Sequence, residues 1–399
     1  MSDTVIQRTY LDHAATTPLD AEVLDAMMPY LTTVFGNPNS LYTEGREAYR
    51  ALEAARESIA AGIGAVAPAE VIFTSGGTEA DNAALAGIME RVAPERKGHF
   101  ITSAFEHHAI IDPAKRLEKQ GYEVTFVKPD SDGFVTPEIL RAAMRPDTKL
   151  VSILAANNEI GTVQPIKELA AVAHEGGALF HTDAVQALGK IPFNVDELGV
   201  DAASFSAHKL YGPRGVGALY LRKRTPFAPQ ILGGGQESKR RSGTQNTAGA
   251  VGFAKALELA LEHMETEGKR LSELRDHLTT QVLARLENTQ ATVSRGPRLP
   301  HLASLLINGV EGEAMLLNLD NAGFAISTGS ACSSGSLEPS HVLLSVGVPQ
   351  EIAHGSLRVS LGKSSSRADI DAFVDALVPI VERFRSMNPV YERMFGNKA

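Results

Sequence analysis

The feature that most constrains the fold of this chain is a regular alternation of short apolar runs with helical segments, which begins near residue 70. The apolar runs, often rich in β-branched residues or phenylalanine, are 71–74, 100–102, 124–127, 150–154, 179–181, 202–206 and 216–222. Segments with helical character lie between the first five runs, at 78–90, 107–120, 137–144 and 166–174. Strands that alternate with helices predict a mostly parallel sheet with helices packed on both of its faces.

A second, smaller unit is expected after this alternation. From residue 248 to about residue 286 the chain is rich in Ala, Leu and Glu and predicts one long helix. Further strands are predicted at 301–308, 325–327 and 356–361, which indicates a small α+β unit. A chain of 399 residues is long enough for two domains of this kind.

Composition excludes several classes of protein. The 38 Lys and Arg residues are outnumbered by 47 Asp and Glu residues, giving a formal net charge of −9. This balance argues against binding nucleic acid through a broad basic surface. No apolar run approaches the roughly 20 residues that span a bilayer, and the first residues show no basic segment followed by an apolar core. We therefore expect a cytoplasmic enzyme or binding protein with no membrane segment.

Polar residues follow several of the predicted strands, and ligands bind at the carboxyl ends of the strands in open α/β sheets. Gly76, Gly77 and Thr78 follow the first strand, where a helix begins. The free N–H groups at the start of that helix could bind a phosphate. The alternative is that the turn only joins the strand to the helix. Asn157 and Asn158 follow another strand. Their amides either contact a ligand or form Asx turns.

Two further strand ends carry charged residues. Asp183 follows an apolar run, and a buried carboxylate there requires a partner, either a cationic ring nitrogen or an arginine. His181 and Asp183 also match the His-x-Asp half of a facial iron triad. Lys209, close to Ser206 and His208, is either a nucleophilic amine favoured by burial or a surface lysine. A nucleophilic Lys, an Asp and a Gly/Thr cradle together predict a pyridoxal phosphate site.

Cys332 is the only cysteine, so a disulfide within the chain and a metal cage of several cysteines are excluded. It lies among Ser, Gly, Thr and Ala residues at 327–336, which cannot form a core. We interpret this segment as a mobile loop that brings a thiol to a bound substrate; the alternative is a small apolar filler. Arg358 lies in an apolar alternating strand. Its guanidinium suits a substrate carboxylate or an internal salt bridge.

Several motifs carry a resemblance to a known family. In order they are YLDHAATTP, FGNPNS, FTSGGTEADN, EHHAI, NNEIGTVQPI, HTDAVQALGK, SFSAHKLYGPRGVGALY, RSGTQN and STGSACSSGSLEPSHVL. The chain resembles the cysteine desulfurases of the NifS/IscS-like group, in the class V aminotransferase family of fold-type I pyridoxal phosphate enzymes. The resemblance implies an α/β fold with a large, mostly parallel sheet domain of the seven-stranded type over 16–261. The smaller α+β domain would comprise 1–15 and 262–399.

The resemblance also implies a role for each matching residue. Lys209 would carry the Schiff base to pyridoxal 5′-phosphate, Asp183 would pair with the ring nitrogen, and Gln186 with the ring hydroxyl. His107 would stack on the ring and assist proton transfer. The residues implied to hold the phosphate are Gly77, Thr78, Ser206, His208 and, from a neighbouring subunit, Thr244. The chain would therefore form a homodimer. Asn158 would contact the cofactor and, with Arg358, the substrate carboxylate.

The implied activity is conversion of L-cysteine to L-alanine with a persulfide on Cys332. That sulfur would pass to an acceptor such as an iron–sulfur scaffold or a sulfur relay protein. No metal is expected within the chain, although Cys332 would be able to ligate an iron–sulfur cluster transiently with a partner. A selenocysteine lyase or a cysteine/cystine lyase of the same fold is an alternative; a non-haem iron oxygenase and a non-catalytic scaffold protein are others. The sequence leaves open the acceptor, the pathway, a preference for selenocysteine and the need for a helper subunit.

Overall fold

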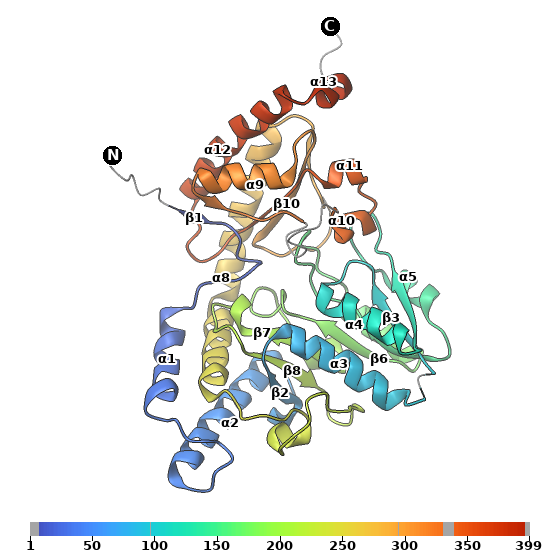
Figure 1. The fold of residues 1–399 in the computed structure, drawn as a ribbon, viewed down its shortest axis with the longest axis vertical. Helices are drawn as coiled ribbons and strands as arrows, with labels where there is room; N and C mark the ends of the chain where they lie inside the picture. Colours follow the sequence, from blue (N-terminus) through green and yellow to red (C-terminus); the bar gives the residue numbers. More distant parts are fainter. Residues whose placement is uncertain (1–7, 96, 294, 330–338, 396–399) are drawn as a thin grey trace.

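The computed structural model describes residues 8–95, 97–293, 295–329 and 339–395. A large sheet with its helices forms the lower part of the molecule in Figure 1, and smaller sheets with their helices form the upper part. The long helix α8 (Thr247–Arg285) runs from one part into the other. The sequence predicts this helix to within one residue at each end.

The large sheet has seven strands in the order β2-β8-β7-β6-β5-β3-β4. Its strands are β2 (Val71–Thr74), β3 (His99–Ser103), β4 (Glu123–Val127), β5 (Thr148–Ser152), β6 (Leu179–Asp183), β7 (Ala202–Ser206) and β8 (Gly217–Leu221). Only β8 runs against its neighbours; the remaining pairs in the sheet are parallel. The predicted fold class, an α/β protein with a mostly parallel sheet, is confirmed.

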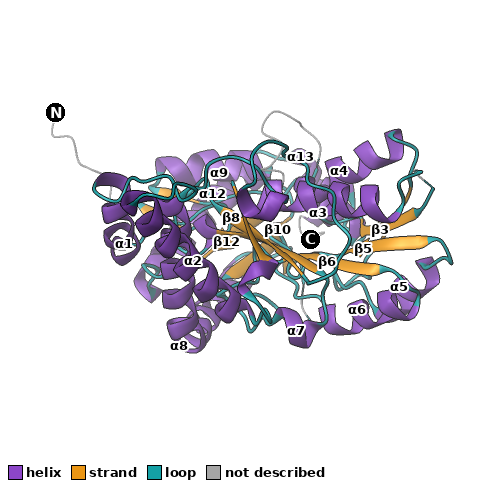
Figure 2. Ribbon diagram, turned by 90° about the horizontal axis from the view of Figure 1, so that it is seen from below, coloured by secondary structure: helices purple, strands orange, loops and turns teal. Residues whose placement is uncertain are grey.

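Helices cover both faces of this sheet (Figure 2). One face carries α3 (Gly77–Val92) and α4 (His108–Lys119); the other carries α5 (Pro137–Ala143), α6 (Ile166–Glu175) and α7 (Val195–Leu198). Successive strand residues point to opposite faces, so Phe100 packs in the cluster with α3 and α4, whereas Ile101 packs in the main core on the other side. Burial on both faces explains the continuous apolar runs.

Two helices precede the first strand of the large sheet, in a stretch that the sequence predictions leave unassigned. They are α1 (Ala21–Thr32) and α2 (Thr43–Ile63), and both pack against α8. Gly64 ends α2 in the left-handed conformation, with a φ of 72° that a glycine adopts without strain. A short 3₁₀ turn, η1 (Pro68–Glu70), then leads into β2.

The upper part contains a three-stranded antiparallel sheet in the order β12-β10-β9 and a parallel pair, β1 with β11. These strands are β1 (Thr9–Tyr10), β9 (Thr289–Ala291), β10 (Leu302–Ile307), β11 (Phe324–Ala325) and β12 (Ser356–Ser360). Its helices are α9 (Gly312–Asn321), α10 (His341–Ser345), α11 (Gln350–Ala353), α12 (Arg367–Ser386) and α13 (Pro389–Phe395). The predicted strand at 325–327 is shorter than expected, and Ser327 makes only an isolated bridge to Arg358.

The N-terminal segment connects the two parts. Ala14 donates its N–H to Ser360 Oγ at the end of β12, and Thr17 donates to the carbonyl of His208 beyond β7. The proposed division into domains at residue 261 falls inside α8, which is unbroken there, so that boundary stays a prediction. In the described ranges, no helix is both long enough and apolar enough to cross a membrane.

Candidate active site

A cavity of about 440 Å³ lies at the carboxyl ends of β2, β6 and β7, below β12. It is lined by residues that come from distant parts of the sequence. The predicted site residues among them are Gly77, Thr78, His107, Asn158, Asp183, Gln186, Ser206, His208, Lys209 and Arg358. Because parallel strands end at the same edge of a sheet, polar residues at their ends meet in one place.

The turn between β2 and α3 packs so closely against its neighbours that glycines are required there. A Cβ atom added to Gly77 would lie 2.7 Å from Val185 Cγ2, and one added to Gly217 would lie 2.7 Å from the backbone of Gly76. Gly77 begins α3, whose first N–H groups have no partner within the helix. With Thr78 and Ser206 on the same wall, this turn suits a phosphate group.

Asp183 ends β6 at the floor of the cavity and is only 8% exposed. Its Oδ1 accepts a hydrogen bond from Val185 N at 2.9 Å, and no ion pair to Asp183 occurs within the described ranges. Burial raises the pKa of this carboxyl, and the charges of His107 and Lys209 oppose that rise. A buried carboxylate with this surrounding fits a cationic ring nitrogen better than the arginine considered from the sequence.

Lys209 ends the short 3₁₀ turn η2 (Ala207–Lys209), directly after β7. Its Nζ donates to the carbonyls of Ala14 and Ala15, both at 2.6 Å. The N-terminal segment therefore holds this amine at the cavity wall. His107 caps α4, and its Nδ1 accepts from Ala109 N at 3.0 Å, which places the ring proton on Nε2. Burial lowers the pKa of His107, so the imidazole is predominantly neutral.

Gln186 and His208 are positioned by neighbours that the sequence predictions did not assign. Gln186 Nε2 donates to the carbonyl of Ala14 at 2.9 Å, and its Oε1 accepts from Lys190 Nζ at 3.0 Å. His208 Nδ1 and Thr16 Oγ1 form a hydrogen bond of 3.0 Å. The motif YLDHAATTP contributed to the resemblance without a role for its residues; it forms one wall of the site.

Arg358 in β12 forms the internal salt bridge considered from the sequence and also lines the cavity. Its Nη2 donates to Asp12 Oδ1 at 2.8 Å in an internal ion pair, and its Nη1 donates to the carbonyl of Asn158 at 2.9 Å. The guanidinium is 4% exposed, lines the cavity, and keeps an Nε without a hydrogen-bond partner in the described part of the chain. Asp12 is a site residue that the sequence analysis missed.

The two asparagines differ in role. Asn157 is fully buried: its Oδ1 accepts from Glu159 N and Ile160 N, and its Nδ2 donates to the carbonyl of Phe105. It therefore maintains the turn after β5, as an Asx turn does. Asn158 is the one that lines the cavity.

A second buried acid, Asp81 on α3, was also missed. It lines the cavity at 1% exposure, and burial together with the charge of Asp183 raises its pKa. An aspartate one turn into a helix that starts at a strand end is the signal that could have identified it.

The iron-triad alternative is not supported. Both ring nitrogens of His181 are occupied by serine hydroxyls, Ser152 Oγ at 2.8 Å and Ser204 Oγ at 3.0 Å. Burial lowers its pKa to about 3. In the part of the chain that the structure describes, no three His, Cys, Asp or Glu side chains are grouped as metal ligands, and the parallel sheet differs from the antiparallel double sheet of that enzyme class.

Two predicted residues are not placed in this cavity. Cys332 belongs to 330–338 and lies outside the described residues. The described chain before it ends with Ser327, which lines the cavity, and Gly329, which donates to Ser356 Oγ. After it, Ser340 Oγ donates to Glu159 Oε2 at 2.5 Å, and burial raises the pKa of Glu159 to about 7.

Thr244 is exposed and is not among the residues that line the cavity. It lies in a loop that follows the 3₁₀ turn η3 (Gln236–Lys239), and Asn39 Nδ2 donates to the adjacent Gln245 Oε1. Glu237 anchors this loop: its carboxylate accepts from Arg56 Nη1 at 2.6 Å, Arg56 Nη2 at 2.9 Å and Phe73 N at 3.0 Å.

Replacement of Glu237 tests that anchor. Glu237→Ala leaves Arg56 charged, buried and without its main partner, so we expect unfolding to become easier by about 3–5 kcal/mol, measured by urea denaturation. Glu53→Ala is the matched control, because Glu53 is the other and more exposed partner of Arg56. That variant should cost about 1 kcal/mol or less. Equal losses of unfolding free energy in Glu237→Ala and Glu53→Ala would contradict the anchoring role of Glu237.

Comparisons with known proteins agree with this geometry. The family described as aminotransferase class-V matches residues 9–373. A protein from Dictyoglomus turgidum named cysteine desulfurase IscS is 50% identical over 392 residues, which cover 98% of this chain and 99% of that protein. A solved structure of a NifS-like protein superposes with a TM-score of 0.89 at 38% identity, over 94% of this chain and 100% of that one. A structure of SspA in complex with cysteine has a TM-score of 0.75 at 35% identity, over 88% and 98% of the two chains.

Proposed function

The chain belongs to the cysteine desulfurases of the class-V aminotransferase family, and from this we propose that its cavity holds pyridoxal 5′-phosphate and converts L-cysteine to L-alanine with a persulfide on Cys332. The observation that carries the proposal is the convergence, in one cavity, of a glycine turn at a helix start, a buried Asp183 and the amine of Lys209. These are the three groups that the phosphate, ring nitrogen and aldehyde of the cofactor require.

The residues have separate tasks in holding the cofactor. Gly77, Thr78, Ser206 and His208 would hold the phosphate at the start of α3. Asp183 would pair with the ring nitrogen, Gln186 with the ring hydroxyl, and Lys209 Nζ would bind the aldehyde carbon. His107 and Asn158, which line the same cavity, would contact the ring. When bound, pyridoxal phosphate supplies an electron sink for negative charge that develops at the substrate Cα.

The remaining chemistry is performed by side chains of the chain itself. Arg358 and Asn158 bind the substrate carboxylate, with Asp12 orienting the guanidinium at 2.8 Å. Lys209 Nζ would move the proton at the substrate Cα, and neutral His107 would assist. The Cys332 thiolate then forms an S–S bond with the substrate sulfur while the Cβ–S bond breaks. Protonation of the carbon leaves alanine, and the persulfide stays on Cys332.

The assay that tests this proposal measures products. Purified protein loaded with cofactor is incubated with L-cysteine and a thiol reductant, and alanine, pyruvate and sulfide are quantified together. We expect alanine and sulfide in equal amounts, and the mass of one extra sulfur atom on the peptide with Cys332 when the reductant is omitted. Pyruvate in place of alanine would identify the cysteine lyase alternative. Selenocysteine as the markedly better substrate would identify the selenocysteine lyase.

Arg358→Lys tests the binding of the substrate carboxylate. A lysine keeps the charge but loses the bidentate fork, so KM for L-cysteine should rise by about 10–100-fold, the equivalent of one charge-assisted hydrogen bond. Arg222→Lys is the control, because Arg222 pairs with Asp196 away from the cavity. An unchanged KM in Arg358→Lys would mean that the arginine only pairs with Asp12 and does not bind the substrate carboxylate.

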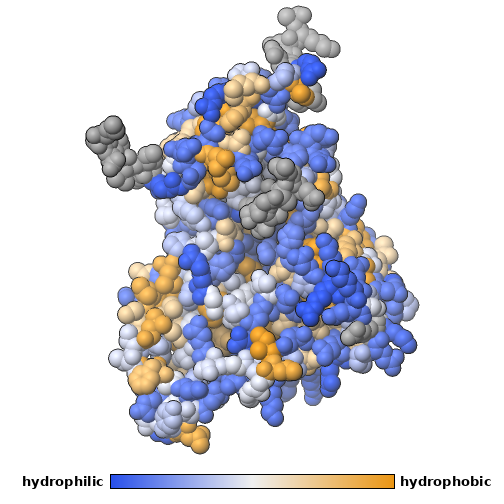
Figure 3. Space-filling model, in the orientation of Figure 1, coloured by the Kyte–Doolittle hydropathy of each residue, from blue (hydrophilic) through white to orange (hydrophobic). Residues whose placement is uncertain are grey.

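A homodimer is part of the proposal, with Thr244 reaching the phosphate held by the second subunit. Exposed apolar side chains support it: some gather over α1 and the start of α2 (Figure 3), and others lie on the loop before Thr244. The most exposed are Phe35 at 77%, Leu41 at 88% and Leu232 at 79%. Large exposed apolar side chains that gather in this way are characteristic of an interface. Light scattering should give the mass of two chains, and a monomeric, fully active enzyme would overturn this part.

The sulfur acceptor is proposed to be a protein, as the persulfide mechanism requires a thiol or scaffold to receive the sulfur. Relatives at this level of identity carry the name IscS, which favours iron–sulfur cluster assembly as the destination. The cytoplasmic location stays a prediction.

A further inference from the structure

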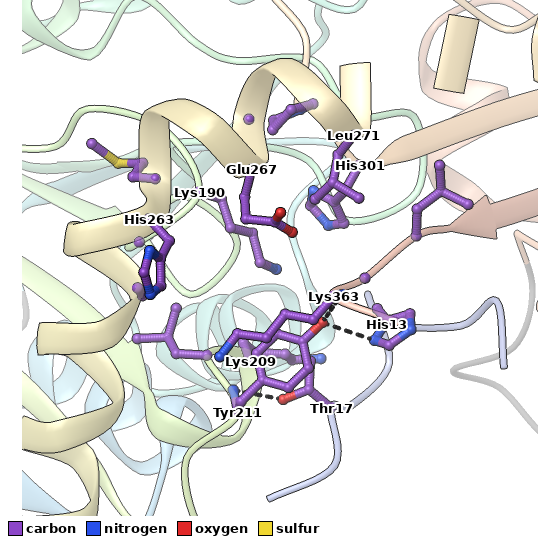
Figure 4. Close-up of a pocket in the computed structure, with 18 of the residues that line it drawn as sticks. His13, Thr17, Lys190, Lys209, Tyr211, His263, Glu267, Leu271, His301 and Lys363 are labelled. Atoms are coloured by element: carbon purple, nitrogen blue, oxygen red, sulfur yellow. Dashed lines mark hydrogen bonds between the residues drawn. The ribbon is translucent and has the colours of Figure 1, made fainter. Parts of the chain in front are cut away.

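A second, smaller cavity of about 70 Å³ lies behind Lys209, on the side away from the cofactor pocket. Figure 4 shows side chains that enter it from both parts of the molecule. His13 comes from the N-terminal segment, Lys190 from the loop after β6, and His301 from the turn before β10. Helix α8 covers one wall with Glu267. Apart from Lys209, which lines both cavities, no residue of this cavity has a role in the proposed reaction.

The two histidines have unmet hydrogen-bonding capacity. His13 and His301 are each only 2% exposed. Within the described residues, neither ring nitrogen of His301 has a hydrogen-bond partner, and neither does His13 Nε2. Lys190 Nζ has one described hydrogen bond, to Gln186 Oε1. Buried polar groups without partners are costly and uncommon, so the two histidines leave hydrogen-bonding capacity for a guest, and the Lys190 ammonium has donors beyond its bond to Gln186.

The charges around the cavity select the sign of that guest. Lys190, Lys209 and Lys363 all line it. Glu267 is the acidic lining residue, and its carboxylate is held by Arg270 through two bonds of 2.8 Å. Lys363 is paired in turn with Asp20. With the one lining carboxylate already neutralised and hydrogen-bond donors facing inward, the site disfavours a cation. The described residues also contain no trio of side chains suited to a metal ion.

We propose that this cavity is a binding site for a small monovalent anion, a halide or a carboxylate of formate size, held by His13, Lys190 and His301. A volume of about 70 Å³ is sufficient for an ion of a few heavy atoms. Burial lowers the pKa of Lys190 to about 7 and that of His13 to about 4. A bound anion offsets this cost of burial, because it favours the charged form of each group.

The site is connected to the cofactor pocket by two hydrogen bonds. Lys190 Nζ donates to Gln186 Oε1, and Gln186 Nε2 donates to the carbonyl of Ala14, on which Lys209 Nζ also rests. An anion that keeps Lys190 charged strengthens its donation to Gln186. Occupancy therefore stabilises the wall of the cofactor pocket without contacting the substrate. The binding itself does not rest on the proposed function.

The direct test is diffraction from crystals of the cofactor-loaded protein soaked in sodium bromide. We expect an anomalous bromide peak within hydrogen-bond distance of His13, Lys190 or His301. Density for water alone in the cavity, with bromide only at the molecular surface, overturns the proposal.

Thermal unfolding tests the same site in solution. At equal ionic strength, the midpoint of the wild-type protein should be higher in sodium chloride or formate than in sodium gluconate, whose anion is much larger than a halide or formate. The reason is that a ligand that binds only the folded state stabilises it. A rise with chloride alone assigns an inorganic anion, and a rise with formate assigns a carboxylate. Equal midpoints in all three salts contradict the proposal.

Variants locate the effect. His301→Leu and Lys190→Met should each weaken the apparent affinity for the anion by at least tenfold, and Lys190→Met serves alone if His301→Leu fails to fold. His263→Leu is the matched control, since His263 lines the same cavity but is exposed at its rim. An anion effect that survives in both inner variants, or disappears in His263→Leu, places binding elsewhere.

Discussion

Lys209→Ala is expected to lower the rate of alanine formation by a factor on the order of 10³ or more, as removal of a covalent catalytic group does in other enzymes. In the proposed reaction the side chain has two tasks: it would bind the cofactor covalently, and its Nζ would move the proton at the substrate Cα. The structure adds a third contribution, because the bonds from Nζ to Ala14 and Ala15 hold the amine at the cavity wall. All three are lost together in the variant.

The measurement pairs activity with the site of attachment. After reduction with borohydride, mass spectrometry should find the cofactor on the peptide with Lys209 in the wild-type protein and in Lys190→Ala, whose lysine lies 3.0 Å from Gln186 and is the nearest alternative buried amine described here. Lys209→Ala should carry none, while its circular dichroism remains that of the folded protein. Cofactor attached to Lys190, or to no lysine in the wild type, would contradict the assignment.

Cys332→Ala is expected to abolish the transfer of sulfur, with alanine formation falling by about 10³-fold, because no second group can accept the sulfur as the Cβ–S bond breaks. The chain has one cysteine, so no neighbouring thiol replaces it. Cofactor binding should be unchanged, since the groups proposed to hold the cofactor belong to other residues, which line the cavity. The absorption of the bound cofactor in the visible range measures this directly.

Ser333→Ala is the control for that variant, as it changes the adjacent residue in the same segment and leaves the thiol in place. It should retain wild-type alanine formation within a few-fold. Pyruvate formation that persists in Cys332→Ala would separate the two halves of the proposal: the pyridoxal phosphate site would stand, and the role of the cysteine would be wrong.

The sequence was most informative where chemistry depends on local order. Strand periodicity, the glycine turn before Thr78 and the polar residues after each strand are properties of neighbouring residues, and each motif is readable within a dozen positions. Since parallel strands end at one edge of a sheet, the fold class alone predicted that Gly77, Asp183 and Lys209 would meet. The described structure places them in one cavity.

The partners of these residues required the tertiary structure. Asp12 pairs with Arg358 across 346 positions of sequence, and Glu237 holds Arg56 across 181. Neither pair has a periodic or spacing signal, because each depends on how distant segments pack. For the same reason the sequence left Asn157 and Asn158 equivalent, whereas burial makes the first structural and leaves the second in the cavity.

The sequence by itself thus determined the α/β fold class, through local patterns of polarity and residue type, and the family, through its motifs; it also predicted the groups proposed to perform the chemistry. Only the tertiary structure decided that the N-terminal segment forms a wall of the site, and that His13, Lys190 and His301 enclose a second cavity behind Lys209. The physical reason is that the cavity and its unpaired donors exist only where two sheets and α8 pack together. The residues that meet there are far apart in the sequence, so no local pattern indicates the contact.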